Sequence, residues 1–327
     1  MEDRDGRSIG IDIFHSVSIP GVCYKIYRTY FMPENSICTI QPPPQNQFSA
    51  KQIYWLDEIM EKEGIHIEHA LNGGERRISL MSNSRFVDGF CEATNTVFQF
   101  EGCWMHGCCK CFASETRHPL KTYSFLDRET GEEVERNFQI RSQGYTLVQI
   151  WECEWDRHVK KNKLKYDREE LHHRMPLNPR DSYFGGRTEC IVPYYKFSGS
   201  ERGHYVDVTS MYPAVMAGCV YPVGPPTILI KGRDPMVPWE SFLGVAKIKI
   251  RSPASMHLPF LPTRSADNKV LFALGTFVGT YTSVEIKKAL ELGYVVLDTY
   301  EQWHYPASST ELFKSYIDTF YEMKKEA

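Results

Sequence analysis

Cysteine spacing constrains the fold of this 327-residue chain more than any other feature. The stretch GCWMHGCCKC at residues 102–111 contains four cysteines, and the later segment WEC supplies another. The candidate ligands of one metal ion are Cys103, Cys108, Cys111 and Cys153, the first three in the pattern C-x4-C-x2-C. Four thiolates at one point suit tetrahedral zinc, and such a closed shell orders a loop without performing chemistry. The spacing favours structural zinc over buried free thiols or a disulfide, and Cys109 could replace Cys108 as a ligand.

The composition and charge of the chain are ordinary for a soluble globular protein. Hydrophobic residues make up 42% and charged residues 24% of the chain, which argues against wholesale disorder. The net charge of -3 means that any nucleic-acid surface must be a local patch. The first residues lack the apolar stretch of a signal peptide. The uncharged run Val208–Ile230 holds four prolines, which cannot share a spanning helix. We therefore expect an intracellular protein that is not secreted, with no membrane segment and no disulfide framework.

The pattern of the first half predicts an α/β unit followed by a charged linker. A helix closed by Gly64 is followed by a strand, a hairpin, a second helix and a strand. The expected positions are 51–64, 77–81, 85–90, 95–100, 129–142 and 145–153. The predicted divisions are 1–45 as a remnant, 46–157 as the zinc-binding module, 158–178 as a solvated linker and 179–327 as a second domain.

The second domain is expected to contain strands at 204–208 and 244–250 and two capped helices. Thr282 and Glu285 form a capping box for a helix that Gly293 ends. Ser308 and Glu311 repeat that pattern before a last helix with a broad apolar stripe. A stripe of this size needs a partner surface, which indicates a chain cut within a domain.

A second group of candidate site residues consists of Asp88, Gln99, Glu101 and His106. Asp88 ends one predicted strand, and Gln99 and Glu101 lie on the next. Acidic residues on adjacent strands are how a magnesium-dependent nuclease holds its metal. Asp-Gly pairs are also common turns, and His106 could be a loop histidine without a role, so both interpretations stay open.

The segment VDGFCEATNTVFQFEGCWMHGCCKC…GYTLVQIWECEW resembles the core of very-short-patch-repair endonucleases, which belong to the restriction-endonuclease-like superfamily. The resemblance covers about residues 50–157 and follows the order Asp, Gly-Cys-x-x-His, Trp-Glu-Cys. It implies structural zinc on the four cysteines, a catalytic metal on Asp88 and cleavage assisted by His106. Related polymerase-linked copies read EFHG where this chain reads QFEG, so Gln99 replaces a carboxylate and Glu101 a histidine. Because an amide binds magnesium less strongly, a DNA-binding or structural role also stays open.

A different signal, HYVDVTSMYP at residues 204–213, places Asp207 at the end of a predicted strand, before a turn and a helix. A carboxylate there can reach a magnesium ion held by a triphosphate. The Ser210–Tyr212 turn can offer backbone N–H groups to phosphates. Asp207 could equally be the N-cap of an ordinary strand-to-helix junction.

DVTSMYP resembles motif A of family B DNA polymerases, Asp-x-x-Ser-Leu-Tyr-Pro, with Met211 in place of Leu. The resemblance implies that Asp207 binds the catalytic magnesium ions, that Ser210 and Met211 lie against the incoming triphosphate, and that Tyr212 rejects a ribose 2′-hydroxyl. It therefore implies nucleotidyl transfer with two metal ions.

The segment YFGGRTE at residues 183–189 resembles the Tyr-x-Gly-Gly element of the same polymerases. The implied DNA contacts are Tyr183, Gly185, Gly186 and Arg187. Glycines allow close approach of backbone to template phosphates, and an arginine can pair with one.

The order of these segments along nearly the whole chain resembles Maverick/Polinton-type polymerases, the protein-primed branch of family B carried by eukaryotic transposons. The same order includes the segments NGGE and LFKSYIDTFYEMKKEA. The resemblance implies an α/β (α+β) fold in which a restriction-endonuclease-like module precedes the first part of a polymerase palm. It also implies primer-template DNA, deoxynucleoside triphosphates and a terminal-protein primer as partners, and a nuclear location.

Two motifs of that family are not found in this sequence: motif B, with its Lys and Tyr, and the Asp-Thr-Asp motif that supplies a second catalytic aspartate. The exonuclease motifs are expected upstream of Met1. One aspartate cannot hold a two-metal site, so we expect no polymerase activity from these residues alone. Three functions stay open: a fragment of a DNA-directed DNA polymerase, a restriction-like endonuclease, and a non-catalytic zinc-stabilised DNA-binding remnant.

Overall fold

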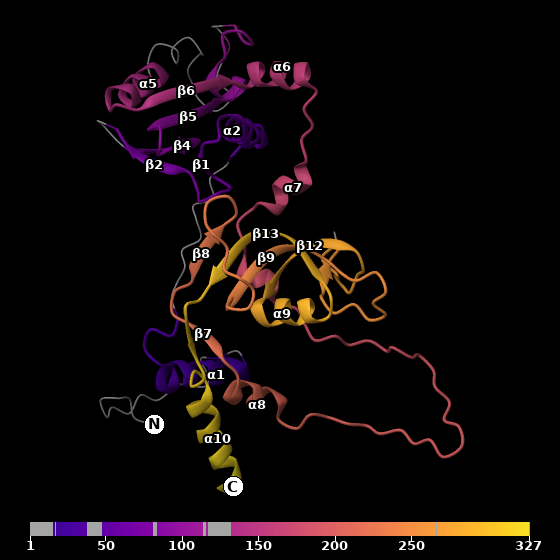
Figure 1. Cartoon of the computed structure of the whole chain (residues 1–327). Helices are drawn as coiled ribbons and strands as arrows, with labels where there is room; N and C mark the ends of the chain where they lie inside the picture. The colour runs from indigo at the N-terminus through magenta and orange to yellow at the C-terminus, as the bar shows by residue number, and fades with distance from the viewer. Residues whose placement is uncertain are drawn as a thin grey trace.

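The computed structural model describes residues 16, 18–37, 48–80, 84–113, 116, 132–265 and 267–326, which form a mixed α/β structure (Figure 1). The predicted proline-rich break lies mostly outside these residues, as does the beginning of the helix expected at 129–142. The α/β class expected from the sequence is confirmed.

The N-terminal unit, residues 48–162, is built around a four-stranded sheet of order β1-β4-β5-β6. Its strands are β1 Glu68–His69, β4 Gly89–Cys91, β5 Thr96–Glu101 and β6 Thr146–Trp151, with the hairpin of β2 Arg76–Ser79 and β3 Ser84–Val87. Its helices are α2 Ala50–Glu63, α3 Cys103–His106, α5 Glu132–Ser142 and α6 Glu152–Asn162. Strands β5 and β6 are parallel, as a strand–helix–strand crossover requires. The predicted order of helix, strands, helix and strand is confirmed, but the strand expected at 85–90 divides at Asp88 into β3 and β4, which belong to different sheets.

Strand β5 is buried along its whole length because helices cover both of its faces. Phe98 and Phe100 pack with Trp155 of α6 on one face. Val97 packs with Ile140 of α5 on the other. Since side chains alternate along a strand, Gln99 and Glu101 lie on the face of Val97. The polar residues of β5 therefore share a buried surface with α5.

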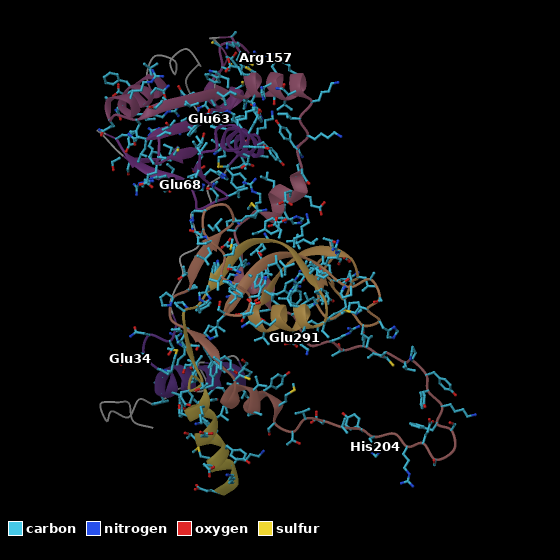
Figure 2. The ribbon with its side chains drawn as sticks, in the orientation of Figure 1. Glu34, Glu63, Glu68, Arg157, His204 and Glu291 are labelled. Atoms are coloured by element: carbon cyan, nitrogen blue, oxygen red, sulfur yellow. The ribbon has the colours of Figure 1, made fainter. Side chains whose placement is uncertain are left out.

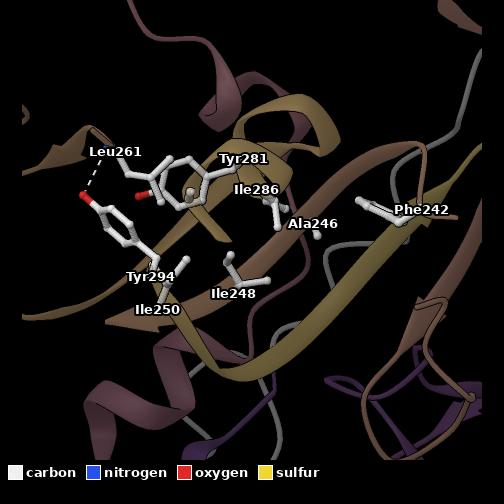
Figure 3. Close-up of a cluster of buried hydrophobic side chains, with 9 residues drawn as sticks. Phe242, Ala246, Ile248, Ile250, Leu261, Tyr281, Ile286 and Tyr294 are labelled. Carbon is white, nitrogen blue, oxygen red and sulfur yellow. Dashed lines mark hydrogen bonds between the residues drawn. The ribbon is translucent and has the colours of Figure 1, made fainter. Parts of the chain in front are cut away.

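The central sheet is antiparallel, with strand order β12-β9-β13-β8. Its elements are β8 Thr227–Ile230, β9 Gly244–Arg251, β12 Thr276–Thr282, β13 Val295–His304 and the covering helix α9 Ser283–Glu291. The short strands β10 Thr263–Arg264 and β11 Val270–Leu271 pair with each other. Ile248 and Ile250 of β9 pack with Ile286 of α9 in one buried cluster (Figure 3). The strand predicted at 244–250 and the Thr282–Glu285 capping box are both confirmed.

The strap, residues 163–182, crosses the face of the central sheet opposite α9 and contains α7 Arg168–His173 and the 3-10 turn η3 Pro179–Ser182. Lys247 Nζ of β9 donates to Met175 O at 3.0 Å, and the Leu177 N–H donates to Glu301 Oε2 at 2.8 Å. Leu171 and Leu177 are buried. The prediction of a solvated linker over 158–178 is wrong for the part that holds Leu171 and Leu177, because these side chains are buried and the backbone there bonds to the sheet.

The helical cluster comprises α1 Ile19–Ile26, the π-helical turn η2 Tyr27–Phe31, α8 Met211–Gly218 and α10 Lys314–Glu326, joined by the pair β7 Tyr221–Val223 and β14 Ala307–Ser309. The Tyr27 ring lies 5.1 Å from Phe313, and its hydroxyl donates to Leu312 O at 2.9 Å. The apolar stripe of the last helix thus has a partner surface within the chain. The predicted Ser308–Glu311 box is wrong, because Ser308 pairs with β7 and the helix begins later.

The arm, residues 183–210, is an exposed irregular segment that extends away from the central sheet before α8 begins (Figure 1). The strand predicted at 204–208 is wrong. An unpaired strand leaves its backbone N–H and C=O groups without partners, and no strand in the described part of the chain pairs with these residues.

Candidate functional site

Four thiols meet at one corner of the N-terminal unit. The Sγ atoms of the group all lie within 4.8 Å of one another, and its members are Cys103, Cys108, Cys111 and Cys153. Cys108 Sγ lies 3.9 Å from Cys153 Sγ. A disulfide would require about 2.05 Å, whereas two sulfurs on a tetrahedral zinc with bonds of about 2.3 Å are about 3.8 Å apart. The donor set therefore fits zinc, and all four are free thiols.

Local backbone geometry explains how these thiols meet. Gly107 adopts φ 62° after α3, and the Cys108 N–H donates to Cys103 O at 3.1 Å. Cys153 was expected at a strand end, but it lies in the first turn of α6, where its N–H donates to Cys103 Sγ at 3.3 Å. Cys109 is exposed and outside the group. Of the two neighbouring cysteines, Cys108 therefore lies in the thiol group and Cys109 does not.

The pKa values of two thiols in the group are shifted in opposite directions. Burial raises the pKa of the Cys103 thiol. At Cys153 burial acts in the same direction, but hydrogen bonds from Cys103, Cys111 and Arg157 outweigh it and lower the pKa. Glu152 Oε2 accepts from the Cys103 N–H at 3.2 Å and is itself bound by Lys51. A thiolate is the form of cysteine that binds a metal, and fixed hydrogen-bonding groups around it orient it for binding.

Glu101 is engaged by protein groups on several sides. It is 2% exposed, and His106 Nδ1 and Gln149 Nε2 lie 2.9 Å and 3.0 Å from its carboxylate oxygens. The Arg136 guanidinium pairs with the same carboxylate. Burial alone raises the pKa of a carboxyl group, but His106 and Arg136 hold the pKa of Glu101 at about 2. The carboxylate of Glu101 is therefore in contact with three protein side chains, those of Arg136, His106 and Gln149.

Sequence reasoning missed Arg136 and Gln149 as members of this network. The sequence did offer one sign of Gln149, namely a glutamine inside each of two apolar strands. These two residues, Gln99 and Gln149, are direct partners in the parallel register of β5 and β6. The buried Gln99 and Glu101 need polar partners, and the exposed Gln149 on the neighbouring strand supplies one to Glu101.

Asp88 lies at the bend between β3 and β4, and its Oδ2 accepts from the Phe100 N–H at 2.7 Å. Burial raises the pKa of Asp88 to about 7, with smaller contributions from Glu75 and Glu101, while the Phe100 N–H and His106 act in the opposite direction. Within the described residues, the four cysteines are the one group of three or more His, Cys, Asp or Glu at metal-binding distances. Asp88, Glu101 and His106 do not form such a group.

The Tyr-x-Gly-Gly element lies where the strap passes into the arm. The Arg187 guanidinium stacks 4.4 Å from the Phe272 ring centre, and Nη1 donates to Pro259 O at 2.6 Å. Open space surrounds Gly185 and Gly186. Beside them lies a hollow of about 420 Å³, whose walls include Phe184, Leu258, Phe260 and Leu292. The element is thus fixed to the central sheet, with its glycines and the exposed Tyr183 facing open space.

Asp207 lies in the arm and is exposed. Helix α8 begins after it, as expected, but the N-cap is Ser210, with φ 54°, so the interpretation of Asp207 as the N-cap is wrong. Tyr212 is 78% exposed in the first turn of the helix. Figure 2 shows His204 on the arm, on the other side of the central sheet from the N-terminal unit. Asp207 is therefore not brought together with Asp88 or the thiols.

These features define an α/β chain with a group of four free thiols and with polymerase-like sequence elements at the two ends of an exposed arm. The chain matches the model of the family described as DNA polymerase type B, organellar and viral, over residues 122–327, more than half its length, and it belongs to that family. The family B resemblance is confirmed at this level, and the Maverick/Polinton type stays a prediction.

A relative and two solved structures were found. A "Probable DNA polymerase" of Neurospora intermedia is 32% identical over 154 residues, which are 45% of this chain and 15% of that protein. Phi29 DNA polymerase in an orthorhombic crystal form is 22% identical with a TM-score of 0.29, over 37% of this chain and 22% of that one. Phi29 DNA polymerase with primer-template DNA is 20% identical with a TM-score of 0.27, over 37% and 21%. The chain thus spans a small part of each polymerase, and these TM-scores are too low to superimpose functional residues.

Every helix in the described part of the chain is too short or too polar to cross a membrane.

Proposed function

We propose that this chain forms the first part of the palm of a DNA-directed DNA polymerase that transfers deoxynucleotides to a primer on a DNA template. The supporting observation is that the family match over residues 122–327 contains both YFGGRTE and DVTSMYP. We extend the proposal to a protein-primed enzyme of a Maverick/Polinton-type transposon that acts in the nucleus, on the order of the sequence segments. Its partners are primer-template DNA, deoxynucleoside triphosphates and a terminal protein.

Magnesium is the cofactor that this proposal implies. Divalent ions in such sites need several oxygen ligands, and in the described residues Asp207 belongs to no group of three or more His, Cys, Asp or Glu at metal-binding distances. The residues present therefore do not fit a two-metal site by themselves. We derive no catalytic step through magnesium and assign to Asp207 one ligand position in the complete polymerase.

The other residues of the proposed site would contact or sterically exclude parts of the nucleotide and the DNA. Tyr212 is exposed on α8 and would block a ribose 2′-hydroxyl, while Ser210 and Met211 would lie against the triphosphate. Gly185 and Gly186 leave room for template backbone, since nothing lies within 4 Å of a Cβ built on either. Tyr183 and Arg187 would contact the DNA at the same place.

The test is a primer-extension assay on the longest protein product of the gene. Asp207→Asn is expected to reduce incorporation by more than roughly 100-fold, because even residues that only support a metal ligand cost 10–100-fold when removed. Tyr212→Ala is expected to increase ribonucleotide incorporation. Asp318→Asn, at an exposed position on α10, is the matched control and should leave the rate unchanged. Native incorporation by the Asp207 variant would refute the proposal.

For the N-terminal unit we propose a structural zinc ion held by Cys103, Cys108, Cys111 and Cys153. When bound, the ion supplies a cross-link between the α3 loop and α6. Metal analysis of the purified chain should give one zinc per molecule. Cys108→Ser should lose it, while Cys109→Ser, the neighbouring exposed thiol, should keep it. Equal zinc content in both variants would exclude this ligand set.

The restriction-like endonuclease is the second candidate function of this unit. This candidate is supported by Asp88, which is buried, has a raised pKa and interacts electrostatically with His106. The engagement of Glu101 by Arg136 and His106 argues for the structural alternative instead. Magnesium-dependent nicking of duplex DNA that disappears in Asp88→Ala would establish the nuclease. Absence of nicking by the native chain leaves a zinc-stabilised DNA-binding unit.

A further inference from the structure

Residues 157–165, RHVKKNKLK, concentrate positive charge at one place on a chain whose net charge is -3. The stretch contains no acidic residue, and its five basic members are Arg157, Lys160, Lys161, Lys163 and Lys165. All five are exposed, along the second half of α6 and the coil after it. Figure 2 shows Arg157 on α6 at the outer edge of the N-terminal unit. We call residues 157–165 the basic stretch.

The four lysines of the basic stretch are exposed and have no counter-charge in the part of the chain that the structure describes. Within the described residues, none of the four forms an ion pair. The exposed Lys196 and Lys324 also lack an ion pair in the described residues, whereas Lys269, Lys288, Lys314 and Lys325 each have a carboxylate partner. Four neighbouring cations without partners repel one another, and a bound polyanion relieves that repulsion.

The acidic residues that flank the basic stretch are already engaged. Asp156 Oδ2 binds Lys51 Nζ at 2.9 Å, and Glu154 pairs with Lys110. Asp167 Oδ1 caps α7 by accepting from the Glu170 N–H at 3.0 Å. The positive potential of the basic stretch is therefore not cancelled by its neighbours in sequence.

Helix stability explains only part of this pattern. Lys160 and Lys161 lie in the last turn of α6, where the helix dipole favours cations. Lys163 lies beyond the helix with φ 54°, a left-handed position where glycine or asparagine is preferred. Lys165 has no helical position at all. A lysine at a glycine position indicates that the side chain serves something other than the fold.

The N-terminal end of α6 is fixed in the thiol group, and this determines where the basic stretch lies. Cys153 lies in the first turn of the helix, within the thiol group, and Arg157 Nη2 lies 3.7 Å from Cys153 Sγ. The helix of 11 residues spans about 16 Å. The basic stretch is thus the far end of a rigid element that is anchored at the thiols.

We propose that the basic stretch binds the phosphate backbone of duplex DNA without reading its sequence. Lysines act as point charges on phosphates and provide no planar group that would read a base edge. Single strands are gripped by stacking bases on free aromatic rings. The two rings closest in sequence are occupied, because Tyr166 stacks on Tyr54 at 4.4 Å and His158 stacks on Trp155 at 5.3 Å. The surface is separate from the arm and adds a second DNA contact to the proposed palm.

The experiment measures the affinity of the purified chain for a labelled random-sequence duplex at increasing sodium chloride. Each phosphate contact contributes about 0.9 to the slope of log K against log salt. The variant with Lys160, Lys161, Lys163 and Lys165 changed to Gln is expected to reduce that slope by about 3.6. The control variant changes Lys269, Lys288, Lys314 and Lys325 to Gln, which removes the same charge, and should keep the native slope. Equal slopes in the native chain and the first variant, or equal losses in both variants, would overturn the proposal.

Two further measurements distinguish this proposal from a purely structural role of the lysines and from other polyanionic partners. Lys163→Gly restores the preferred residue at the helix end, so its melting temperature should not fall while the slope drops by about 1. Tighter binding to a single strand of equal length, or equal competition by polyglutamate, would overturn duplex DNA as the partner. Binding is measured without nucleotides, so a failure of the polymerase proposal leaves these results unaffected, and the reverse also holds.

Discussion

Arg174 and Asp57 form a two-pronged ion pair in which Nη1 and Nη2 of the guanidinium donate to the two oxygens of one carboxylate. The pair joins the strap to α2 of the N-terminal unit. Asp57 also lies 3.7 Å from the fully buried His69. Burial, with added repulsion from Arg174, lowers the pKa of His69 to about 3, so this imidazole is neutral at physiological pH.

Arg174→Ala is expected to lower the free energy of unfolding by ~1–3 kcal/mol, because it leaves a partly buried carboxylate without its partner. Arg174→Lys should recover only part of the loss, since an ammonium group cannot form both contacts. Urea unfolding measures the change. Arg251→Ala, at an exposed arginine with no ion pair in the described residues, serves as the control. A loss in Arg174→Ala no larger than in that control would show that the pair does not stabilise the fold.

The pH dependence of stability should reveal the buried carboxyl of Asp88. Its folded pKa of about 7 lies above its ordinary value, 3.8, so the folded state binds this proton more tightly than the unfolded state. Its contribution to stability is complete below about pH 4 and is lost as the pH rises to about 7. Each unit of difference between the two pKa values corresponds to about 1.4 kcal/mol.

Asp88→Asn should therefore flatten the pH dependence of unfolding between about pH 4 and 7 and make the variant the more stable form at pH 8. Thermal melts at a series of pH values provide the measurement. A native profile that is flat over this range would contradict the burial argument. If Asp88 holds a divalent ion, magnesium at pH 8 should stabilise the native chain and not the variant.

Gly244→Ala should prevent normal folding of the central sheet. Gly244 has φ 147°, and a Cβ placed there would lie 1.9 Å from Trp303 O on the neighbouring strand. The expected loss is ~3 kcal/mol or more, the upper end of what overpacking costs. Gly218→Ala, at the end of α8 with nothing within 4 Å of its Cβ, should stay within ~1 kcal/mol of the native chain. Similar stability of the two variants would contradict the close approach of β9 and β13.

Tyr27→Ala should release the first helical segment from α10. The ring contacts Phe313 and Tyr316, and burial raises the pKa of its hydroxyl. Hydrogen exchange should accelerate over residues 19–31 and over α10 together, while the central sheet stays protected. Tyr27→Phe removes only the hydrogen bond to Leu312, at a cost of ~1 kcal/mol, and should keep most of the protection. Acceleration limited to residues 19–31 would show that α10 does not depend on this contact.

Local sequence patterns predicted the elements whose stabilising contacts are local. The Thr282–Glu285 box and the αL glycine after α2 were predicted because their bonds span a few residues. The Ser308–Glu311 pattern fits the same rule but was wrong, because Ser308 pairs with Pro222 on a distant strand. A non-local strand pairing outweighed the local cap.

The sequence predicted which side chains meet in space only where they were all of one chemically distinctive type. Spacing identified the four thiols, because cysteines at metal-ligand intervals have few other uses. The partners of Glu101 were missed, because an arginine on a helix and a glutamine in a strand give no sign in sequence of facing the same carboxylate. The strand expected at 204–208 was wrong for a related reason, since an apolar alternation cannot show whether a neighbouring strand is present to pair with it.

The contact between Tyr27 and Leu312 joins residues 285 positions apart. A ribosome that adds about 5–20 residues per second takes roughly 15–60 s to make the intervening polypeptide. Throughout that interval the aromatic side of the first helical segment has no native partner and is available to chaperones. Newly made chains should therefore complete the helical cluster last, after both sheets have been synthesised.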